Sequence, residues 1–264
     1  MTSPLLAALG VLLAWWLSTG LILWRVRVAD NGPATGHVVS VIGSVPLLAF
    51  GLWGAHQSAN DSTATGIYLG FAAALALWGW IEMAFLSGVL TGPNHAPSPA
   101  DLSPRARFSR ALMAVAWHEL ALLIGLIGLI WASWGGQNTI AAATFALLLV
   151  ARTLAKINLF LGVPRINLQF IPRPIAHMKS HFRTAPATGF FAISICILAA
   201  ITGLLVQRAV DGVTPEETLG DTVLAALAAL ALLEHLFMVL PLPDAKLWAW
   251  MLPKSKPTIK TLKE

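Results

Sequence analysis

Seven ionisable residues lie within otherwise apolar stretches of this sequence, and their types would suit metal binding or the recognition of an acid. They are Glu82, His118, Glu119, Arg152, Lys156, Glu234 and His235. Carboxylates and imidazoles can ligate metals and exchange protons, whereas guanidinium and ammonium groups pair with carboxylates. Arg152 and Lys156 are four residues apart, so on a helix they share one face. These residues can act together only if the fold brings them to one place.

The surrounding composition is that of a polytopic membrane protein. Hydrophobic residues make up 57% of the 264 residues and charged residues only 11%, with a mean hydropathy of +0.74. Soluble domains carry about 25% charged residues. A bilayer core about 30 Å thick requires about 20 mostly apolar residues per helix. We therefore predict an all-α bundle that forms one membrane domain with a basic tail at 241–264. Its seven predicted spans are 4–24, 38–57, 66–91, 108–134, 139–163, 187–207 and 219–240.

Lys and Arg residues are divided unevenly between the two sides of the predicted membrane. Of the 17 in the chain, fourteen fall on the side of the first, third and fifth connections and the tail, with Arg110 among them at the edge of its span, and only Arg208 falls on the opposite side. Arg152 and Lys156 alone lie deep within a span. Positive charge favours the cytoplasmic side. We therefore predict an outside N-terminus and a cytoplasmic C-terminus. The net charge of +5 then reflects orientation and attraction to anionic lipid, and no nucleic-acid partner is expected.

The ionisable residues are predicted to lie at a common depth. A charged group at the centre of a membrane costs at least about 2.5–3.5 kcal/mol on insertion scales. The seven residues should therefore face the interior of the bundle. Counting 1.5 Å per residue from the predicted cytoplasmic span ends places Glu82, Glu119, Arg152 and Glu234 about 9–17 Å from the same face. We predict one polar layer on that side.

Three interpretations of this layer remain open. The first is an ion-pair network in which the three glutamates face Arg152 and Lys156. The second is a ligand site in which His118 or His235 coordinates a metal or the magnesium of a tetrapyrrole, while the basic pair holds an acid. The third is a di-metal oxidase site with ligands from His118, Glu119, Glu82, Glu234 and His235. Neighbouring residues on a helix diverge by about 100°, and this disfavours the di-metal site because each Glu is adjacent to its His.

Other patterns are weaker indications of chemistry. The histidines of "HMKSH" (177–181) have the i,i+4 spacing of metal ligands on a helix. No third ligand follows nearby, so a solvated interfacial loop is the better interpretation. We expect the whole connection 163–186 to be ordered and to lie at the membrane interface. Pro46 should kink the second span. The motifs of P-loop NTPases, α/β-hydrolases and HExxH metalloproteases are absent from the sequence.

Two long blocks and two short ones resemble a known family. The long blocks are "LLLVARTLAKINLFLGVPRINLQFIPRPIAHMKSHFR" (147–183) and "LLEHLFMVLPLPDAKLWAW" (232–250); the short ones are "WIEMAFLSGVLTGP" (80–93) and "WHELALL" (117–123). They are similar to the photosynthetic complex assembly protein 2 (PuhE-type) family of purple phototrophic bacteria. Lys156, Asn158, His177, Ser180 and Phe182 match its pattern, whereas Arg165 and His181 depart from it.

The resemblance implies the biological process in which the protein takes part, and it does not imply a particular chemical reaction. It implies assembly of the photosynthetic reaction centre and core antenna, or modulation of bacteriochlorophyll supply, in the bacterial inner (intracytoplasmic) membrane. The expected partners are reaction-centre or light-harvesting subunits, pigment-biosynthesis enzymes and the lipid bilayer.

We therefore predict a membrane assembly factor whose polar layer binds bacteriochlorophyll, a precursor or another tetrapyrrole. His235 or His118 would be the axial ligand, Arg152 and Lys156 would neutralise carboxylates, and Glu234 would orient a histidine. One alternative is a metal-dependent, di-iron-like oxidoreductase that acts on a tetrapyrrole or carotenoid, and another is a structural scaffold. A binding role is favoured over an enzymatic one. The predicted ligand-binding set is Glu82, His118, Glu119, Arg152, Lys156, Asn158, Glu234 and His235.

Overall fold

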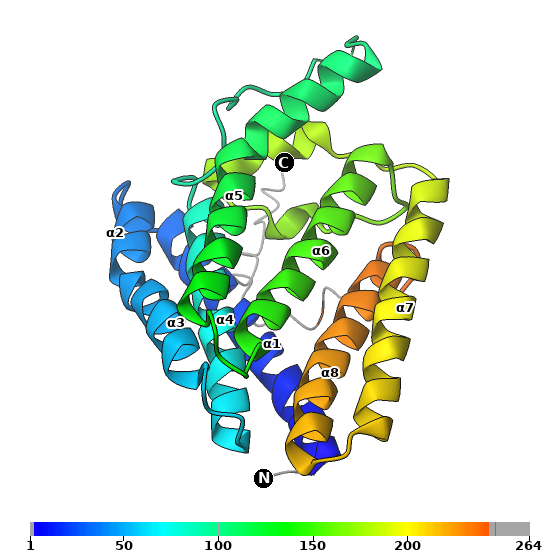
Figure 1. Ribbon diagram of the computed structural model, residues 1–264. Coiled ribbons are helices and arrows are strands. Elements are labelled where there is room, and N and C mark those ends of the chain that lie inside the picture. The colour runs from blue at the N-terminus through cyan, green and yellow to red at the C-terminus, as the bar shows by residue number, and fades with distance from the viewer. Residues whose placement is uncertain (1–2, 100, 243–245, 247–264) are drawn as a thin grey trace, which may run out of the picture.

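A computed structural model of the chain describes residues 3–99, 101–242 and 246, which form a bundle of helices (Figure 1). The α-helices are α1 (Pro4–Asp30), α2 (Gly36–Gly43), α3 (Val45–Ser58), α4 (Ala64–Leu86), α5 (Pro104–Ala132), α6 (Ile140–Leu161), α7 (Gly189–Asp211) and α8 (Pro215–Phe237). Two 3₁₀ segments, η1 (Leu168–Phe170) and η2 (Arg173–His181), follow α6. No β-strand occurs within these residues, so the predicted all-α class is confirmed. Most of the predicted tail at 241–264 lies outside the described residues.

The described chain forms seven crossings that are long and apolar enough to span a membrane, with α2 and α3 together making the second. Their bounds differ from the predicted spans. The first helix continues to Asp30 rather than residue 24, because no helix-breaking residue precedes Asn31. The third crossing ends at Leu86 rather than residue 91, since Gly88 takes a left-handed conformation with φ of 75°. The last begins at Pro215, where Thr214 and Glu217 form a capping box.

The second crossing is interrupted where the sequence predicts a kink. α2 ends at Gly43, α3 begins at Val45, and Pro46 lies in the first turn of α3. Proline lacks the backbone N–H and its ring displaces the preceding turn. Beyond the break, α3 packs closely on α4. A Cβ added to Gly54 would stand only 2.9 Å from the Cβ of Ala73, so a larger residue would push the two helices apart.

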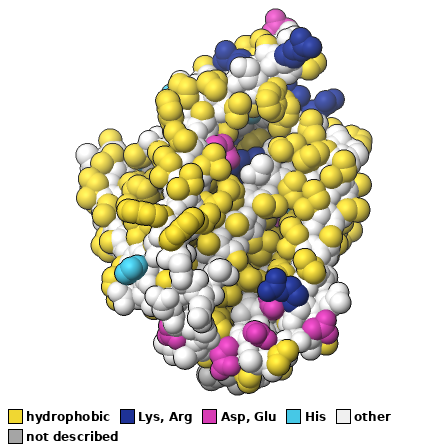
Figure 2. Space-filling view, in the orientation of Figure 1, with side chains coloured by type: hydrophobic (Ala, Val, Ile, Leu, Met, Phe, Trp, Pro, Cys, Tyr) yellow, Lys and Arg dark blue, Asp and Glu magenta, His cyan; other side chains and the backbone are white. Residues whose placement is uncertain are grey.

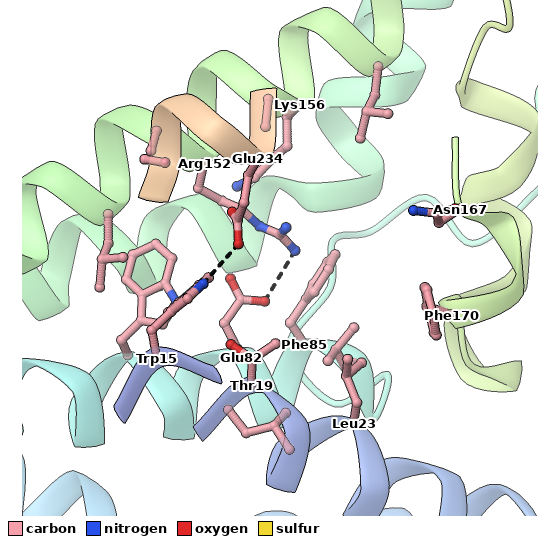
Figure 3. Close-up of a pocket in the computed structure, with 18 of the residues that line it drawn as sticks. Trp15, Thr19, Leu23, Glu82, Phe85, Arg152, Lys156, Asn167, Phe170 and Glu234 are labelled. Carbon is pink, nitrogen blue, oxygen red and sulfur yellow. Dashed lines mark hydrogen bonds and ion pairs between the residues drawn. The ribbon is translucent and has the colours of Figure 1, made fainter. Parts of the chain in front are cut away.

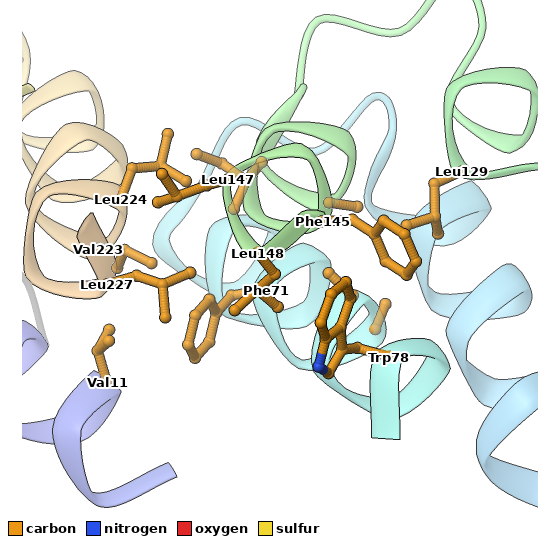
Figure 4. Packing of buried hydrophobic residues seen from close by; sticks show 14 of the residues in the cluster. Val11, Phe71, Trp78, Leu129, Phe145, Leu147, Leu148, Val223, Leu224 and Leu227 are labelled. Carbon is orange, nitrogen blue, oxygen red and sulfur yellow. The ribbon is translucent and has the colours of Figure 1, made fainter. Parts of the chain in front are cut away.

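α4 is the central helix of the bundle. Two thirds (67%) of its most apolar stretch is buried, against 11% for α7 at the edge. Its side chains Phe71 and Trp78 pack among apolar residues of α1, α6 and α8 (Figure 4). Trp78 meets Phe145 of α6 edge-on, with ring centroids 5.2 Å apart. Lipid tails are as apolar as leucine, so close packing of this kind stabilises helix contacts in membranes.

The two ends of the bundle carry different charges (Figure 2). One end, here called the basic end, carries Arg25, Arg27, Arg105, Arg107, Arg110, Arg165, Arg173, Lys179 and Arg183. The opposite end carries Asp61, Asp211, Glu216, Glu217 and Asp221, and the one arginine described there, Arg208, lies with its Nη2 3.2 Å from Asp221 Oδ1. This separation is what the positive-inside rule requires. The outside N-terminus and cytoplasmic C-terminus remain a prediction.

The connection between α6 and α7 folds over the basic end and is attached to α1. The backbone N–H of Arg173 donates to the Asp30 carboxylate at 3.2 Å, and its Nη1 donates to the Asp30 carbonyl oxygen at 3.0 Å. His37 Nε2 lies 3.2 Å from the same carboxylate. Asp30 thus joins the end of α1 to the start of η2. The prediction of an ordered connection agrees with this attachment.

One histidine of η2, His181, is more deeply buried than the sequence suggests. His181 is only 4% exposed, and the neighbouring Ile175 and Met178 are also buried. The interpretation of 177–181 as a solvated loop is therefore wrong for His181. The reason is the apolar pattern of η2, because burying Ile175 and Met178 also draws His181 under the segment.

Candidate functional site

A cavity of about 420 Å³ lies between α1, α4, α6 and α8, and η1 and η2 contribute to its wall. Most of the wall is apolar or aromatic, including Trp15, Trp78, Phe85 and Phe170. Small-molecule sites in proteins are typically cavities of about 300–1,000 Å³ with apolar walls and a few placed polar groups. Predicted site residues supply such groups here, namely Glu82, Arg152, Lys156, Glu234 and His235 (Figure 3).

Arg152 of α6 and Glu82 of α4 form an ion pair in the cavity wall. Arg152 Nη2 donates to Glu82 Oε2 at 3.2 Å, and the side chains are 39% and 9% exposed. Within the described residues this is the one hydrogen bond of the Arg152 side chain, and its Nε is buried without a partner. A guanidinium carries five N–H donors. Most of the donor capacity of Arg152 is therefore unused.

His118 of α5 lies outside the cavity wall and contacts Glu82 from behind. Its Nε2 is 3.5 Å from Glu82 Oε1, and its Nδ1 is 3.3 Å from Glu119 Oε1. The backbone N–H of His118 donates to the Thr91 carbonyl oxygen at 2.9 Å, and the ring packs on Phe85 with centroids 4.1 Å apart. These contacts fix a fully buried imidazole between two carboxylates.

Lys156 lines the cavity, but its ammonium group is already paired. It donates to Glu119 Oε1 and lies 3.5 Å from His118 Nδ1. Lys156 and Glu119 are each partly exposed. The prediction that Arg152 and Lys156 act together on a ligand acid is therefore weakened, because Lys156 has a protein carboxylate of its own.

Glu234 and His235 both line the cavity from α8, although they are adjacent in sequence. Glu234 Oε1 accepts a hydrogen bond from Trp15 Nε1 at 2.9 Å (Figure 3). His235 Nδ1 lies 2.8 Å from the Ala231 carbonyl oxygen. A carbonyl only accepts, so this contact places the proton on Nδ1 and leaves a lone pair on Nε2. That Nε2 is buried without a partner, in a side chain only 2% exposed.

Asn158 lies apart from the other predicted site residues. It is fully buried on α6, donates from Nδ2 to Ser194 Oγ of α7 at 2.9 Å, and is absent from the cavity wall. Polar contacts of this kind join neighbouring helices in membranes. The geometry therefore gives Asn158 a packing contact with α7, rather than the ligand contact that was predicted.

The described residues contain no group of three or more His, Cys, Asp or Glu side chains that could hold a metal ion. The carboxylates face N–H groups instead of a common centre, since Glu82 pairs with Arg152 and Glu119 pairs with Lys156. A di-metal site requires its carboxylates to converge. The predicted ligand set His118, Glu119, Glu82, Glu234 and His235 does not show that arrangement.

Aromatic cavity residues were not predicted from the sequence. Trp15 donates to Glu234 across the cavity, and Phe85 and Phe170 flank the same space (Figure 3). One signal was present for Trp15. Membrane tryptophans concentrate at the two interfaces, whereas Trp15 lies at the middle of the predicted span 4–24. A mid-span tryptophan three residues before Ser18 was a candidate for an interior contact.

The fold and the cavity define a seven-crossing helical membrane protein with a ligand-sized polar site inside the bundle. Residues 1–258 match the family described as "Protein of unknown function (DUF3623)", and the chain belongs to this family. The chain is 47% identical over 264 residues to a Rhodobacter capsulatus protein described as "Uncharacterized 30.4 kDa protein in puhA 5'region". That match covers 100% of this chain and 96% of the relative. No solved structure matches the chain.

Proposed function

We propose that the protein is an assembly factor for the photosynthetic reaction centre and core antenna, and that its cavity holds bacteriochlorophyll or a precursor. The process is supported by the relative in the puhA region, a photosynthesis gene region. It is also supported by the resemblance of the blocks at 147–183 and 232–250 to the assembly protein 2 family. In this proposal the protein works in the inner membrane beside reaction-centre or light-harvesting subunits, or beside the enzymes that make their pigment.

The observation that best supports a metal-containing ligand is the unpaired Nε2 of His235. A neutral imidazole with an available lone pair is a common metal ligand in proteins. Metal-binding histidines usually donate their other N–H to a carbonyl or carboxylate, and His235 Nδ1 lies 2.8 Å from the Ala231 carbonyl oxygen. A magnesium tetrapyrrole requires such an axial ligand, together with apolar and aromatic surfaces for its flat ring. The cavity wall contains His235 and also the aromatic side chains Trp15, Phe85 and Phe170, which could pack against the ring.

A purely structural scaffold is the second candidate, because the ion pairs Glu82–Arg152 and Glu119–Lys156 join α4, α5 and α6. This candidate leaves the cavity unexplained. Buried polar atoms are hydrogen-bonded in the great majority of cases. His235 Nε2 and Arg152 Nε are buried and unpaired in residues that line the cavity, and a ligand in the cavity would give them partners.

The test replaces His235 with leucine in phototrophic cells that lack their own copy of the gene. Leucine has a similar size and removes the ligand atom together with the Nδ1 contact to the Ala231 carbonyl oxygen within the same helix, so the protein should reach normal abundance in the membrane. We expect the content of assembled reaction centre, measured by absorption of isolated membranes, to fall to the level of cells without the gene. His56→Leu, an exposed position near the opposite end, is the matched control. Unchanged complex content per molecule of His235→Leu would favour the scaffold instead.

A further inference from the structure

We infer that the cavity selects its ligand by a free carboxylate group bound to Arg152, so that the cargo is a metal tetrapyrrole acid rather than the corresponding ester. This inference rests on the proposed function and specifies the chemical class of its ligand. Its basis is the distribution of hydrogen-bonding capacity among the charged side chains of the cavity wall.

Arg152 has more donors than the protein uses. It gives one hydrogen bond to Glu82 at 3.2 Å, its Nε is buried and unpaired, and the side chain, 39% exposed, lines the cavity. Figure 3 shows the guanidinium beside the carboxylates of Glu82 and Glu234, extending toward the side of the cavity where Asn167 and Phe170 lie. The planar fork of a guanidinium matches the two oxygens of a carboxylate. A ligand carboxylate would supply the missing acceptors.

Glu82 has a second neighbour, His118, which would remain beside it if Arg152 moved to bind a ligand carboxylate. Its Oε1 is buried without a hydrogen bond, and it faces His118 Nε2, also unpaired, at 3.5 Å. A small movement would turn this contact into a hydrogen bond. If Arg152 turned toward a ligand, the His118 tautomer with its proton on Nε2, whose Nδ1 would accept from Lys156, would give Glu82 a donor in its place. An arginine whose carboxylate has no alternative partner could not be released without leaving that carboxylate unpaired.

The other charged groups of the wall are less suited to hold the acid. Lys156 is paired with Glu119, which lies outside the cavity wall. Glu234 repels an anion, but it receives its hydrogen bond from Trp15 on α1 and so takes no donor from Arg152. The apolar remainder of the wall favours a largely hydrophobic ligand with one acidic group. Esterification would remove the charge that Arg152 recognises, so the ester should bind more weakly than the acid.

The test compares zinc protoporphyrin IX, which carries free propionates, with its dimethyl ester. Both are titrated into the purified protein in lipid nanodiscs and followed by their absorption. The zinc in each can take one axial ligand, so both probe the contact with His235. A charge-assisted hydrogen bond to a carboxylate makes us expect the acid to bind at least about tenfold more tightly than the ester. Arg152→Gln should lower acid binding to the level of the ester and leave ester binding unchanged. Arg110→Gln, on the basic end, should change neither.

The outcomes separate this inference from the proposed function. Equal binding of acid and ester by the wild-type protein would overturn the inference and leave the pigment site standing. A preference for the acid that persists in Arg152→Gln would also overturn it. Binding of neither compound would remove the pigment site itself. His235→Leu should weaken the binding of both compounds by the same factor. If Arg152→Gln does not fold, the acid–ester ratio of the wild-type protein decides alone.

Discussion

His118 stands between two carboxylates that belong to different ion pairs. One of them, Glu82, lines the cavity and pairs with Arg152, and the other, Glu119, lies outside it and pairs with Lys156. The imidazole therefore connects the cavity to the contact between α5 and α6. A substitution costs more at a buried polar side chain than at one with access to water. The two carboxylates differ in this respect, because the Glu82 side chain is 9% exposed and the Glu119 side chain is 25% exposed.

That difference predicts unequal effects of two conservative substitutions. Glu82→Gln should destabilise the protein by about 1–3 kcal/mol, because it leaves Arg152 and His118 facing a neutral amide in a buried site. Glu119→Gln should cost about 0–1 kcal/mol, since the Glu119 side chain has better access to water than Glu82. Thermal unfolding of the purified variants in detergent measures both. The double variant Glu82→Gln/Arg152→Gln should recover part of the lost stability. A larger loss of stability in Glu119→Gln than in Glu82→Gln would contradict the prediction.

Residue spacing predicted part of this arrangement and could not predict the rest. The i,i+4 spacing of Arg152 and Lys156 and the common depth of the charges indicated that they meet, and the ion pairs show that they do. Spacing could not say which residues face the cavity. Asn158, two residues after Lys156 on α6, turns toward Ser194 of α7 instead. Such choices depend on how α6 is rotated against its neighbours, and one sequence does not contain that information.

At the scale of elements, η2 forms a part of the cavity wall that carries titratable side chains. It contributes Ile175 and Met178 to the cavity, and its start is held by Asp30. Burial lowers the pKa of the His177 imidazole, and the neighbouring His95 lowers it further. Burial also lowers the pKa of His181, with His177 and Arg110 adding to the effect. The closed segment therefore favours neutral histidines.

These shifts predict that acid loosens η2. In the open segment the two histidines regain an ordinary pKa near 6.5. The open form thus binds more protons below that pH, and the stability of the closed segment falls as pH decreases. Hydrogen-exchange protection of residues 173–181, corrected for intrinsic rates, should drop between about pH 7 and pH 5. His177→Gln/His181→Gln should make the protection independent of pH over this range; an unchanged pH response in that variant would assign it to other groups.

Element boundaries depended on local signals of unequal strength. The interruption of the second crossing followed from Pro46, and the early start of α8 was readable in the Thr214–Glu217 capping box. The partial burial of η2 was less accessible, because a short 3₁₀ segment has no strong periodicity. Its contacts with α1 and with the cavity come from residues distant in sequence, such as Asp30.

At the scale of the whole molecule, composition decides most of the architecture. An apolar chain of this length must form helices to satisfy its backbone in lipid, and the seven crossings follow from hydropathy. The cavity does not follow from hydropathy. It is enclosed by α1, α4, α6 and α8, and η1 and η2 complete the wall. Predicting it would require the helix packing itself.

The central claim is that this bundle holds a magnesium tetrapyrrole on His235. The most direct measurement is the absorption spectrum and metal content of the full-length protein, purified in mild detergent from pigment-producing phototrophic cells. The account predicts tetrapyrrole absorption bands together with an equimolar amount of magnesium, both lost in His235→Leu at equal protein yield. A colourless wild-type protein from such cells, or a protein that carries iron in place of magnesium, would contradict it.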